Sequence, residues 1–279
     1  MEKSAIKQEQ DNNEEAVKYL LEAFDDNDPN IEVIQRLVSI YLENENINDA
    51  EYFNEILLKE FPEDPSGFIN ASIISLNNSS PQKAIEYLRP NIEKFEKNYS
   101  ANYLLGTSYY QIDDLINSEK YLLMALSIFP GSRVSKHTLA MIYDQNGSWI
   151  KSDSLYLELI STDSTDAQAY NNFAYSLVER NDNLELALEM SIIANRIQPK
   201  SAPYLDTLGW IYFKLEQYDK ALEYIQASYS IDNTNPVIVE HLADILKATD
   251  QISKANLIYM EAIDIGGDSL LIHQKMKIE

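Results

Sequence analysis

Apolar and small residues recur along the chain with a fixed period. Segments that align with one another begin at Ile31, Pro65, Tyr99, Arg133, Ala167, Ala202 and Pro236, at spacings of 34, 34, 34, 34, 35 and 34 residues. A regular period of this length indicates stacked supersecondary units. The expected units are residues 31–64, 65–98, 99–132, 133–166, 167–201, 202–235 and 236–269.

Equivalent places in these units hold similar side chains. The seventh place is mostly Leu, the eighth is mostly small and the eleventh is often Tyr. The eleventh place holds Tyr41, Ser75, Tyr109, Tyr143, Leu177, Tyr212 and Leu246, and the twentieth holds Ala50, Ala84, Ser118, Ser152, Ala187, Ala221 and Ala255. Places seven, eight and eleven share one face of a first helix, and places twenty, twenty-four and twenty-seven share one face of a second. The small residues predict a close approach of the two helix axes.

Helix-start signals agree with this period. Asp64-Pro65, Ser80-Pro81 and Asn235-Pro236 each read as an N-cap followed by proline in the first turn. Ser132 and Asp166 are expected caps of the units after them. Neither helix of a pair can bury its apolar face alone, so successive pairs must stack. The pattern therefore predicts an all-α solenoid.

The period continues weakly at both ends. Ala16, Leu20 and Ala23 fit the face of a second helix, so residues 1–30 are expected to be an acidic partial repeat or cap. Either the array begins with a shortened unit, or it was cut from a longer protein, which we favour because a half unit exposes an apolar face. Residues 270–279 are expected to be a capping helix or tail.

The unit with the most complete motif is residues 202–235. It contains Leu208-Gly209 followed by Tyr212, then Ala221, and other units end near Pro62, Pro130 and Pro199. A 34-residue helix–turn–helix unit with these residues resembles the tetratricopeptide repeat (TPR), over roughly residues 16–269. The resemblance implies a right-handed superhelical α-solenoid. The last three units are similar to the C-terminal part of long bacterial, Bacteroidota-type TPR arrays, which implies a scaffold or assembly factor near the cell envelope and carries no catalytic residue over.

The charge balance excludes several partners. With 45 acidic and 22 basic residues, the net charge is −23, which disfavours nucleic acid and anionic membranes. Residues 1–64 hold 18 acidic and 5 basic residues, which reads either as solubility or as a docking end for a basic partner. No apolar stretch is long enough to predict membrane insertion. The polar start (MEKSAIKQEQDNN) is not a signal peptide, so the expected compartment is the cytoplasm, or the periplasm or envelope if the chain is a fragment of a lipoprotein.

Sets of residues that perform catalysis are missing from the sequence. There is no cysteine, the 3 histidines lack metal-ligand spacing, and glycine-rich phosphate loops are absent. Glu240-His241 with Asp244 reads as a polar cluster between helix neighbours, or alternatively as metal ligands. We therefore expect no cofactor, no metal and no enzymatic activity.

The best candidate site is the concave side of the stack, which the first helices line in a solenoid. Places two, five, nine, twelve and thirteen lie opposite the packing face. The candidate groove residues are Tyr103, Tyr110, His137, Met141, Asn171, Tyr175, Asp206, Trp210, Phe213 and Asp244. Aromatic and amide side chains on such a surface favour a bound peptide. For Trp210 and Phe213 the alternative is packing between repeats. Basic residues that would clamp a terminal carboxylate are missing, apart from Arg36.

Three functions remain open at this point. The first is a protein-interaction scaffold that holds a polypeptide segment in its groove, in the assembly of a larger complex. The second is an accessory array of a longer protein with an upstream catalytic or envelope-anchored part. The third is a structural array that stacks end to end.

Overall fold

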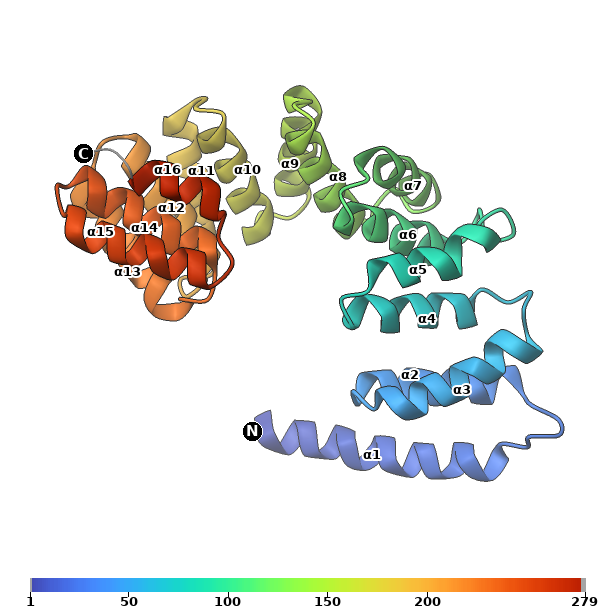
Figure 1. Ribbon diagram of the computed structural model, residues 1–279. Helices are drawn as coiled ribbons and strands as arrows, with labels where there is room; N and C mark the ends of the chain where they lie inside the picture. Colours follow the sequence, from blue (N-terminus) through green and yellow to red (C-terminus); the bar gives the residue numbers. More distant parts are fainter. Residues whose placement is uncertain (1, 277–279) are drawn as a thin grey trace. The chain divides into compact units, whose positions relative to one another are not determined.

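The computed structural model describes residues 2–276, with side chains from residue 13 onward. Over that range the chain is all-α, with sixteen α-helices, one short 3-10 helix and no strand (Figure 1). The helices are α1 (Glu2–Ala23), α2 (Ile31–Glu43), α3 (Ile47–Glu60), α4 (Ser66–Asn77), α5 (Pro81–Leu88), η1 (Arg89–Asn91), α6 (Tyr99–Gln111), α7 (Leu115–Ile128), α8 (Arg133–Gln145), α9 (Trp149–Thr162), α10 (Ala167–Glu179), α11 (Leu184–Ile197), α12 (Ala202–Lys214), α13 (Tyr218–Ile231), α14 (Pro236–Ala248), α15 (Ile252–Asp264) and α16 (Ser269–Met276). Position 1 and positions 277–279 of the expected C-terminal tail lie outside the described residues.

The chain divides into two compact units, Met1–Ile142 and Tyr143–Glu279. In the first unit, α2 packs on α3, α4 on α5 and α6 on α7. In the second unit, α10 packs on α11, α12 on α13 and α14 on α15. Helices adjacent in sequence are thus paired within each unit, as a stack of helical hairpins requires.

Every first helix from α2 to α14 ends in the same turn. The residue at the fifteenth place has a left-handed backbone in each case, at Glu45, Ser79, Asp113, Gly147, Asn181, Glu216 and Asp250. The next residue donates its N–H to the carbonyl of the eleventh place, as Gln217 does to Tyr212 at 2.9 Å. This is a Schellman motif, which satisfies carbonyls at the helix end. The inserted residue of the fifth repeat, residues 167–201, lies in this turn, where Asn183 adds a second left-handed residue.

The expected close approach within a helical pair is confirmed. A Cβ atom added to Gly209 would lie 2.6 Å from Cγ1 of Ile225, and one added to Gly106 would lie 2.8 Å from Cγ of Leu122. At the twentieth place, all seven small residues are fully buried, at 0% exposure: Ala50, Ala84, Ser118, Ser152, Ala187, Ala221 and Ala255. Larger side chains at these places would push the helices apart, because protein interiors are close-packed.

Three of the four tyrosines at the eleventh place fill the space between paired helices by stacking on an aromatic residue twelve positions later. The ring centroids are 5.8 Å apart for Tyr41 and Phe53, 5.7 Å for Tyr109 and Tyr121, and 5.5 Å for Tyr212 and Tyr224. The interplanar angles are all below 15°. The tyrosine is therefore a structural part of the pair and not a surface residue.

The helix caps follow the sequence with one shift and one missing bond. Ser80 precedes α5 as expected, but its hydroxyl donates to the Asn78 carbonyl at 3.1 Å instead of capping the helix. Asn235 accepts from the backbone N–H of Val237 at 3.0 Å, and Asp166 accepts from that of Ala169 at 3.1 Å. At Asp64-Pro65, however, the helix begins one residue later than expected, at Ser66. The Asp64 carboxylate still accepts from the Ser66 N–H at 2.9 Å, so it supplies the hydrogen bond that an N-cap would.

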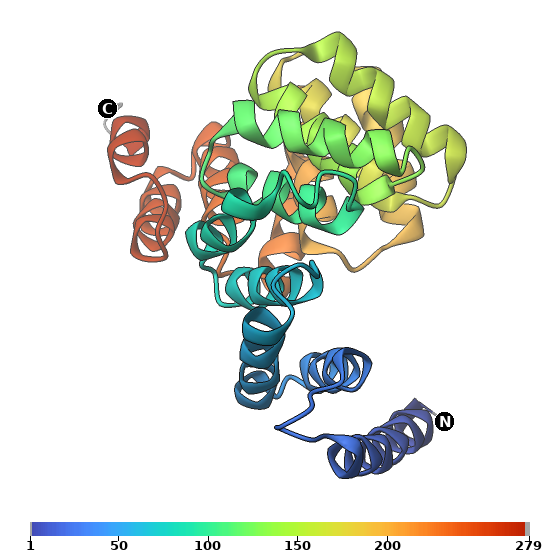
Figure 2. The ribbon, with the colours of Figure 1, turned by 90° about the vertical axis from the view of Figure 1, so that its right-hand side faces the viewer.

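The first helix, α1, packs on α2, and the two lie near one another in Figure 2. Leu20 packs as expected, while the other two packing residues each lie one position after the expected Ala16 and Ala23. Val17, Leu20 and Phe24 pack against the core of α2 and α3, whereas Ala23 is exposed. The larger side chains determine this face, since the Phe24 ring meets the edge of Phe53 at 5.2 Å.

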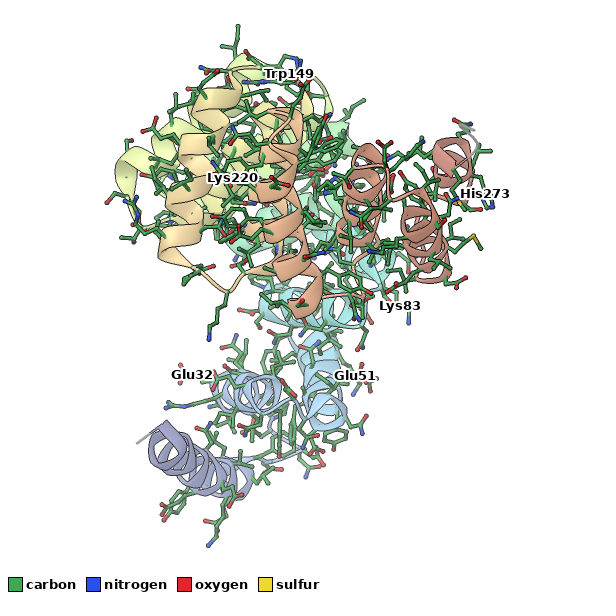
Figure 3. The ribbon with its side chains drawn as sticks, turned by 90° about the vertical axis from the view of Figure 1, so that its left-hand side faces the viewer. Glu32, Glu51, Lys83, Trp149, Lys220 and His273 are labelled. Carbon is green, nitrogen blue, oxygen red and sulfur yellow. The ribbon has the colours of Figure 1, made fainter. Side chains whose placement is uncertain are left out.

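At the other end, α16 covers the last helical pair. Ile272 is fully buried in the core formed by α14 and α15, while the neighbouring His273 is exposed (Figure 3). This short helix takes the position that the first helix of a further unit would occupy, and so shields the apolar face of α15.

Candidate functional site

The candidate site is described within the second unit, on one face of α10, α12 and α14. We call this face the first-helix strip; it contains Asn171, Tyr175, Glu179, Asp206, Trp210, Phe213, Glu240 and Asp244. Positions three or four residues apart share a helix face, so each helix contributes a short row of side chains. The strip mixes aromatic, amide and carboxylate groups. Basic side chains lie beside it, with Nζ of Lys214 4.7 Å from the centre of the Trp210 ring.

Tyr175 is the most open aromatic residue of the strip, with 38% of its surface exposed. Partial burial of the residue, followed by the negative charges of Glu179 and Asp206, raises the pKa of Tyr175 to about 12. The hydroxyl therefore remains protonated at neutral pH and can donate a hydrogen bond to a ligand.

One turn earlier on the same helix, Asn171 has a buried amide. The residue is 6% exposed, and its Oδ1 atom has no hydrogen-bond partner among the described residues. A buried acceptor without a partner costs free energy of about 1–3 kcal/mol. A ligand with a backbone N–H would remove that cost, since an amide side chain bonds an extended backbone well.

Trp210, by contrast, is packed between helices and is only 8% exposed. Its ring stacks on His241 of α14 with centroids 4.0 Å apart, and on Phe213 with centroids 4.8 Å apart. Its Nε1 donates to Oε1 of Glu179 on α10 at 2.9 Å. Of the two interpretations given by the sequence, the structure favours packing between repeats for this residue, because neighbours on two other helices cover the indole.

Asp206, a member of the strip, forms a buried polar pair with His241 of α14. Oδ1 of Asp206 lies 2.9 Å from Nδ1 of His241, and the residues are 5% and 7% exposed. Because this pair joins α12 to α14, we interpret it as a link between neighbouring units that also positions the ring under Trp210. The sequence suggested a polar cluster at His241 but gave no sign that Asp206 was its partner.

Asp244 was expected to face a ligand, and the chain itself satisfies it instead. Its carboxylate accepts a hydrogen bond from the Tyr259 hydroxyl and another from Nζ of Lys275 at 2.6 Å. Lys275, on α16, also pairs with Glu240 at 2.7 Å. Burial lowers the pKa of Lys275, but the bonds to Asp244 and Glu240 outweigh it and leave that pKa above its ordinary value. The terminal helix thus occupies this end of the strip.

The remaining candidates lie in the first unit. Tyr103 is half-buried and stacks on Tyr99 with centroids 5.8 Å apart, while Tyr110 and Met141 are half-buried and His137 is 7% exposed. The structure therefore brings together Asn171, Tyr175, Asp206, Trp210 and Phe213, with Asp244 on the next helix. Their contact with a ligand remains a prediction.

The part of the chain with described side chains holds no group of three His, Asp or Glu residues close enough for a metal ion. The Asp206 and His241 pair is a set of two, and both groups already bond each other. Among the described helices, none is long and apolar enough to cross a bilayer.

A sequence profile of the tetratricopeptide repeat family matches residues 74–264. Among curated proteins, the type IV pilus assembly protein PilF of Pseudomonas aeruginosa is 24% identical over 144 residues, which is 51% of this chain and 57% of that protein. The chain thus spans little more than half the length of the relative it matches.

Two solved structures share the fold over most of the chain. A tetratricopeptide repeat protein from Parabacteroides merdae superposes with a TM-score of 0.72 and 13% identity, covering 94% of this chain and 98% of that one. The structure of the Cut9-Hcn1 hetero-tetramer of the APC/C superposes with a TM-score of 0.74 and 15% identity, covering 89% of this chain and 49% of the other. At such identities the likeness shows the fold alone.

Proposed function

The chain belongs to the tetratricopeptide repeat family, and on that premise we propose that it is a non-catalytic scaffold that binds a polypeptide segment along the first-helix strip. The segment belongs to another protein, and its capture serves the assembly of a larger complex. Tetratricopeptide repeats are protein-interaction modules, so the class of partner follows from the family. The finer proposal concerns where and how this chain holds it.

The observation that carries the proposal is the arrangement of Asn171 and Tyr175 on α10. A buried amide oxygen without a partner lies one turn from an exposed tyrosine whose hydroxyl is a donor. Together they offer one acceptor, one donor and one ring face to a bound backbone. The neighbouring Trp210 and Asp206 are held by His241, so they support this surface rather than contact the segment.

Charge indicates the kind of segment. The net charge of −23 favours a basic partner and accelerates its encounter with the scaffold at low salt. Glu32 and Glu51, both exposed in the first unit, contribute to the field at the acidic N-terminal end (Figure 3). The likeness to a protein named for pilus assembly supports an assembly role over a structural array that stacks on itself.

The proposal is tested with the full chain and a library of displayed linear peptides. Selected peptides should bind the parent, and the variant Tyr175→Ala should bind them at least tenfold more weakly while its helicity stays unchanged. The control is Tyr19→Ala, which removes a tyrosine on α1 that is even more exposed than Tyr175, at 59% against 38%, and should bind as the parent does. Equal binding by the parent and the Tyr175→Ala variant would contradict the proposed surface.

A further inference from the structure

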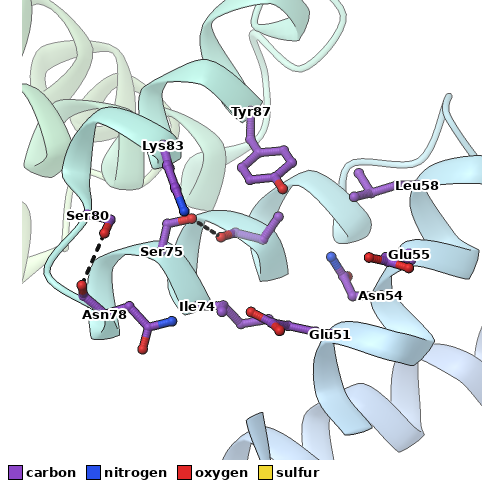
Figure 4. Close-up of a pocket in the computed structure, with 11 residues that line it drawn as sticks. Glu51, Asn54, Glu55, Leu58, Ile74, Ser75, Asn78, Ser80, Lys83 and Tyr87 are labelled. Carbon is purple, nitrogen blue, oxygen red and sulfur yellow. Dashed lines mark hydrogen bonds between the residues drawn. The ribbon is translucent and has the colours of Figure 1, made fainter. Parts of the chain in front are cut away.

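A cavity of about 220 Å³ lies in the first unit between α3, α4 and α5 (Figure 4). Its floor is α4, with Ala71, Ile74 and Ser75, and α3 and α5 form its walls. The wall residues are Glu51, Asn54, Glu55 and Leu58 on α3, and Lys83 and Tyr87 on α5. This cavity is separate from the first-helix strip, because it opens between second helices.

The cavity occurs where the second repeat, residues 65–98, lacks a ring. The eleventh place of this repeat holds Ser75, whereas every other repeat has Tyr or Leu there. Ser75 is 6% exposed, and its hydroxyl donates to the Ala71 carbonyl of its own helix at 2.7 Å. The short side chain leaves unfilled the space into which a tyrosine would extend.

The sixth repeat, residues 202–235, shows what fills the equivalent space. There, the Tyr212 ring stacks on Tyr224 with centroids 5.5 Å apart, and Nζ of Lys220 lies 4.9 Å from the centre of the Tyr212 ring. In the second repeat, Lys83 and Tyr87 stand at the places that Lys220 and Tyr224 hold in the sixth. A cation and an aromatic face are therefore present in the second repeat, and the ring that they would contact is replaced by Ser75.

The cavity also has an unused acceptor. Asn54 is 3% exposed; its Nδ2 donates to the Gly67 carbonyl at 2.9 Å, but its Oδ1 has no partner among the described residues. Asn54 stands at the twenty-fourth place of the first repeat. Most other repeats have an apolar side chain there, as in Leu88, Leu122 and Ile225. A buried amide oxygen in a cavity of this kind favours a ligand that brings a donor.

Size and charge limit the occupant. A cavity of about 150 Å³ is enough to hold a benzene ring, and pockets for drug-sized ligands begin at about 300 Å³. This cavity fits a single aromatic side chain. Its rim carries the exposed carboxylates Glu51 and Glu55, so residues that flank the ring are best basic.

We propose that this cavity is a second binding site, which receives a tyrosine side chain from a basic segment of a partner protein. The ring takes the place that Tyr212 takes in its own unit, stacked on Tyr87 and beneath the Lys83 ammonium group. The phenol donates to Asn54 Oδ1, and the flanking lysine or arginine residues pair with Glu51 and Glu55. Partner and scaffold thus complete one helical pair together.

The test uses the full chain and three short probes: acetyl-Lys-Tyr-Lys-amide, acetyl-Lys-Phe-Lys-amide and acetyl-Lys-Ala-Lys-amide. Backbone amide resonances of Ser75 and Tyr87 are followed by NMR during each titration. We expect saturable shifts with the tyrosine probe, binding several-fold weaker with the phenylalanine probe, and no saturable shift with the alanine probe. Equal responses to the tyrosine and alanine probes, or no response to either, would overturn the proposal.

Two variants locate the site. Ser75→Tyr fills the cavity from within and should weaken binding of the tyrosine probe at least tenfold. Tyr87→Ala removes the stacking partner and should weaken binding by a similar factor, so it tests the site even if Ser75→Tyr folds poorly. Tyr175→Ala, which tests the first-helix strip, should leave this response unchanged. A probe that binds Ser75→Tyr and Tyr87→Ala as it binds the parent does not occupy the cavity.

Discussion

The second and sixth helical pairs, α4 with α5 and α12 with α13, share one backbone plan and differ in how they are filled. In the sixth pair, the absence of a side chain at Gly209 lets Ile225 pack directly against the backbone of α12, and Tyr212 stacks on Tyr224. In the second pair, Ser75 replaces the tyrosine and a cavity opens beside Tyr87. The comparison teaches that the left-handed turn and the small residues determine the repeat, whereas the size of the side chain at the eleventh place determines whether the repeat is closed or offers a pocket.

Tyr212→Ser should convert the closed pair into an open one, and it has the largest expected effect. Replacing a buried aromatic side chain by a small one costs about 3–5 kcal/mol, as lost burial and a cavity add together. We expect a lower urea midpoint by circular dichroism and faster amide exchange confined to α12, α13 and their neighbours. An unchanged midpoint would mean that the ring does not hold the pair together.

Gly209→Leu should force the sixth pair apart. The added side chain meets Ile225, where even a Cβ atom would lie 2.6 Å from Cγ1. Overpacking of this kind typically costs about 1–3 kcal/mol. The melting temperature should fall, while Ser72→Ala, at the same place of the second pair, should leave it nearly unchanged. A parental melting temperature for Gly209→Leu would refute the close approach.

Ser75→Tyr should move the second pair toward the sixth. The new ring can stack on Tyr87 and fill the cavity, which we expect to stabilise the fold by about 1 kcal/mol, the size of an aromatic pair. Thermal unfolding of the parent and the variant measures this difference. Destabilisation would show that the empty space does not match a tyrosine at this position.

The turn shared by both pairs gives the smallest effect. Glu216 and Ser79 have left-handed backbones, with φ of 59° and 51°. That conformation costs a residue with a side chain roughly 1–2 kcal/mol, a cost that glycine does not have. Glycine is more flexible in the unfolded chain, however, and this offsets about 0.5–1 kcal/mol of the gain. Glu216→Gly and Ser79→Gly should therefore each stabilise by about 0.5 kcal/mol, equally in the two pairs. Unequal urea midpoints would show that the turns differ.

Much of the fold follows from local rules that a sequence displays. The small residues at places eight and twenty and the caps at Asn235 and Asp166 predict where helices begin and how closely they pack. The left-handed fifteenth place was not predicted, because its residue type varies: Gly, Asn and Asp favour that conformation, but Glu45, Ser79 and Glu216 give no sign of it. On the packing face of α1, Leu20 was predicted correctly, but the larger Val17 and Phe24 pack against the core where Ala16 and Ala23 were expected.

The candidate site was less predictable, because its state depends on neighbours distant in sequence. Trp210 looks like a surface aromatic residue until His241 and Glu179 are seen to cover it. Asp244 looks like a ligand contact until Lys275 is seen to occupy it. The sequence shows that Ser75 stands where tyrosine is usual, which is a sign of the cavity. The buried Asn54 that lines the cavity comes from the preceding helix, α3, and only the structure shows that it lies there.

Site-specific photo-crosslinking tests the central claim, capture of a polypeptide by the first-helix strip, most directly. The full chain carries p-benzoylphenylalanine at position 175, or at position 19 as the control, and is illuminated with a peptide selected by the parent. We predict a covalent adduct from position 175 and none from position 19. No adduct from position 175, or equal adducts from the two positions, would contradict the account.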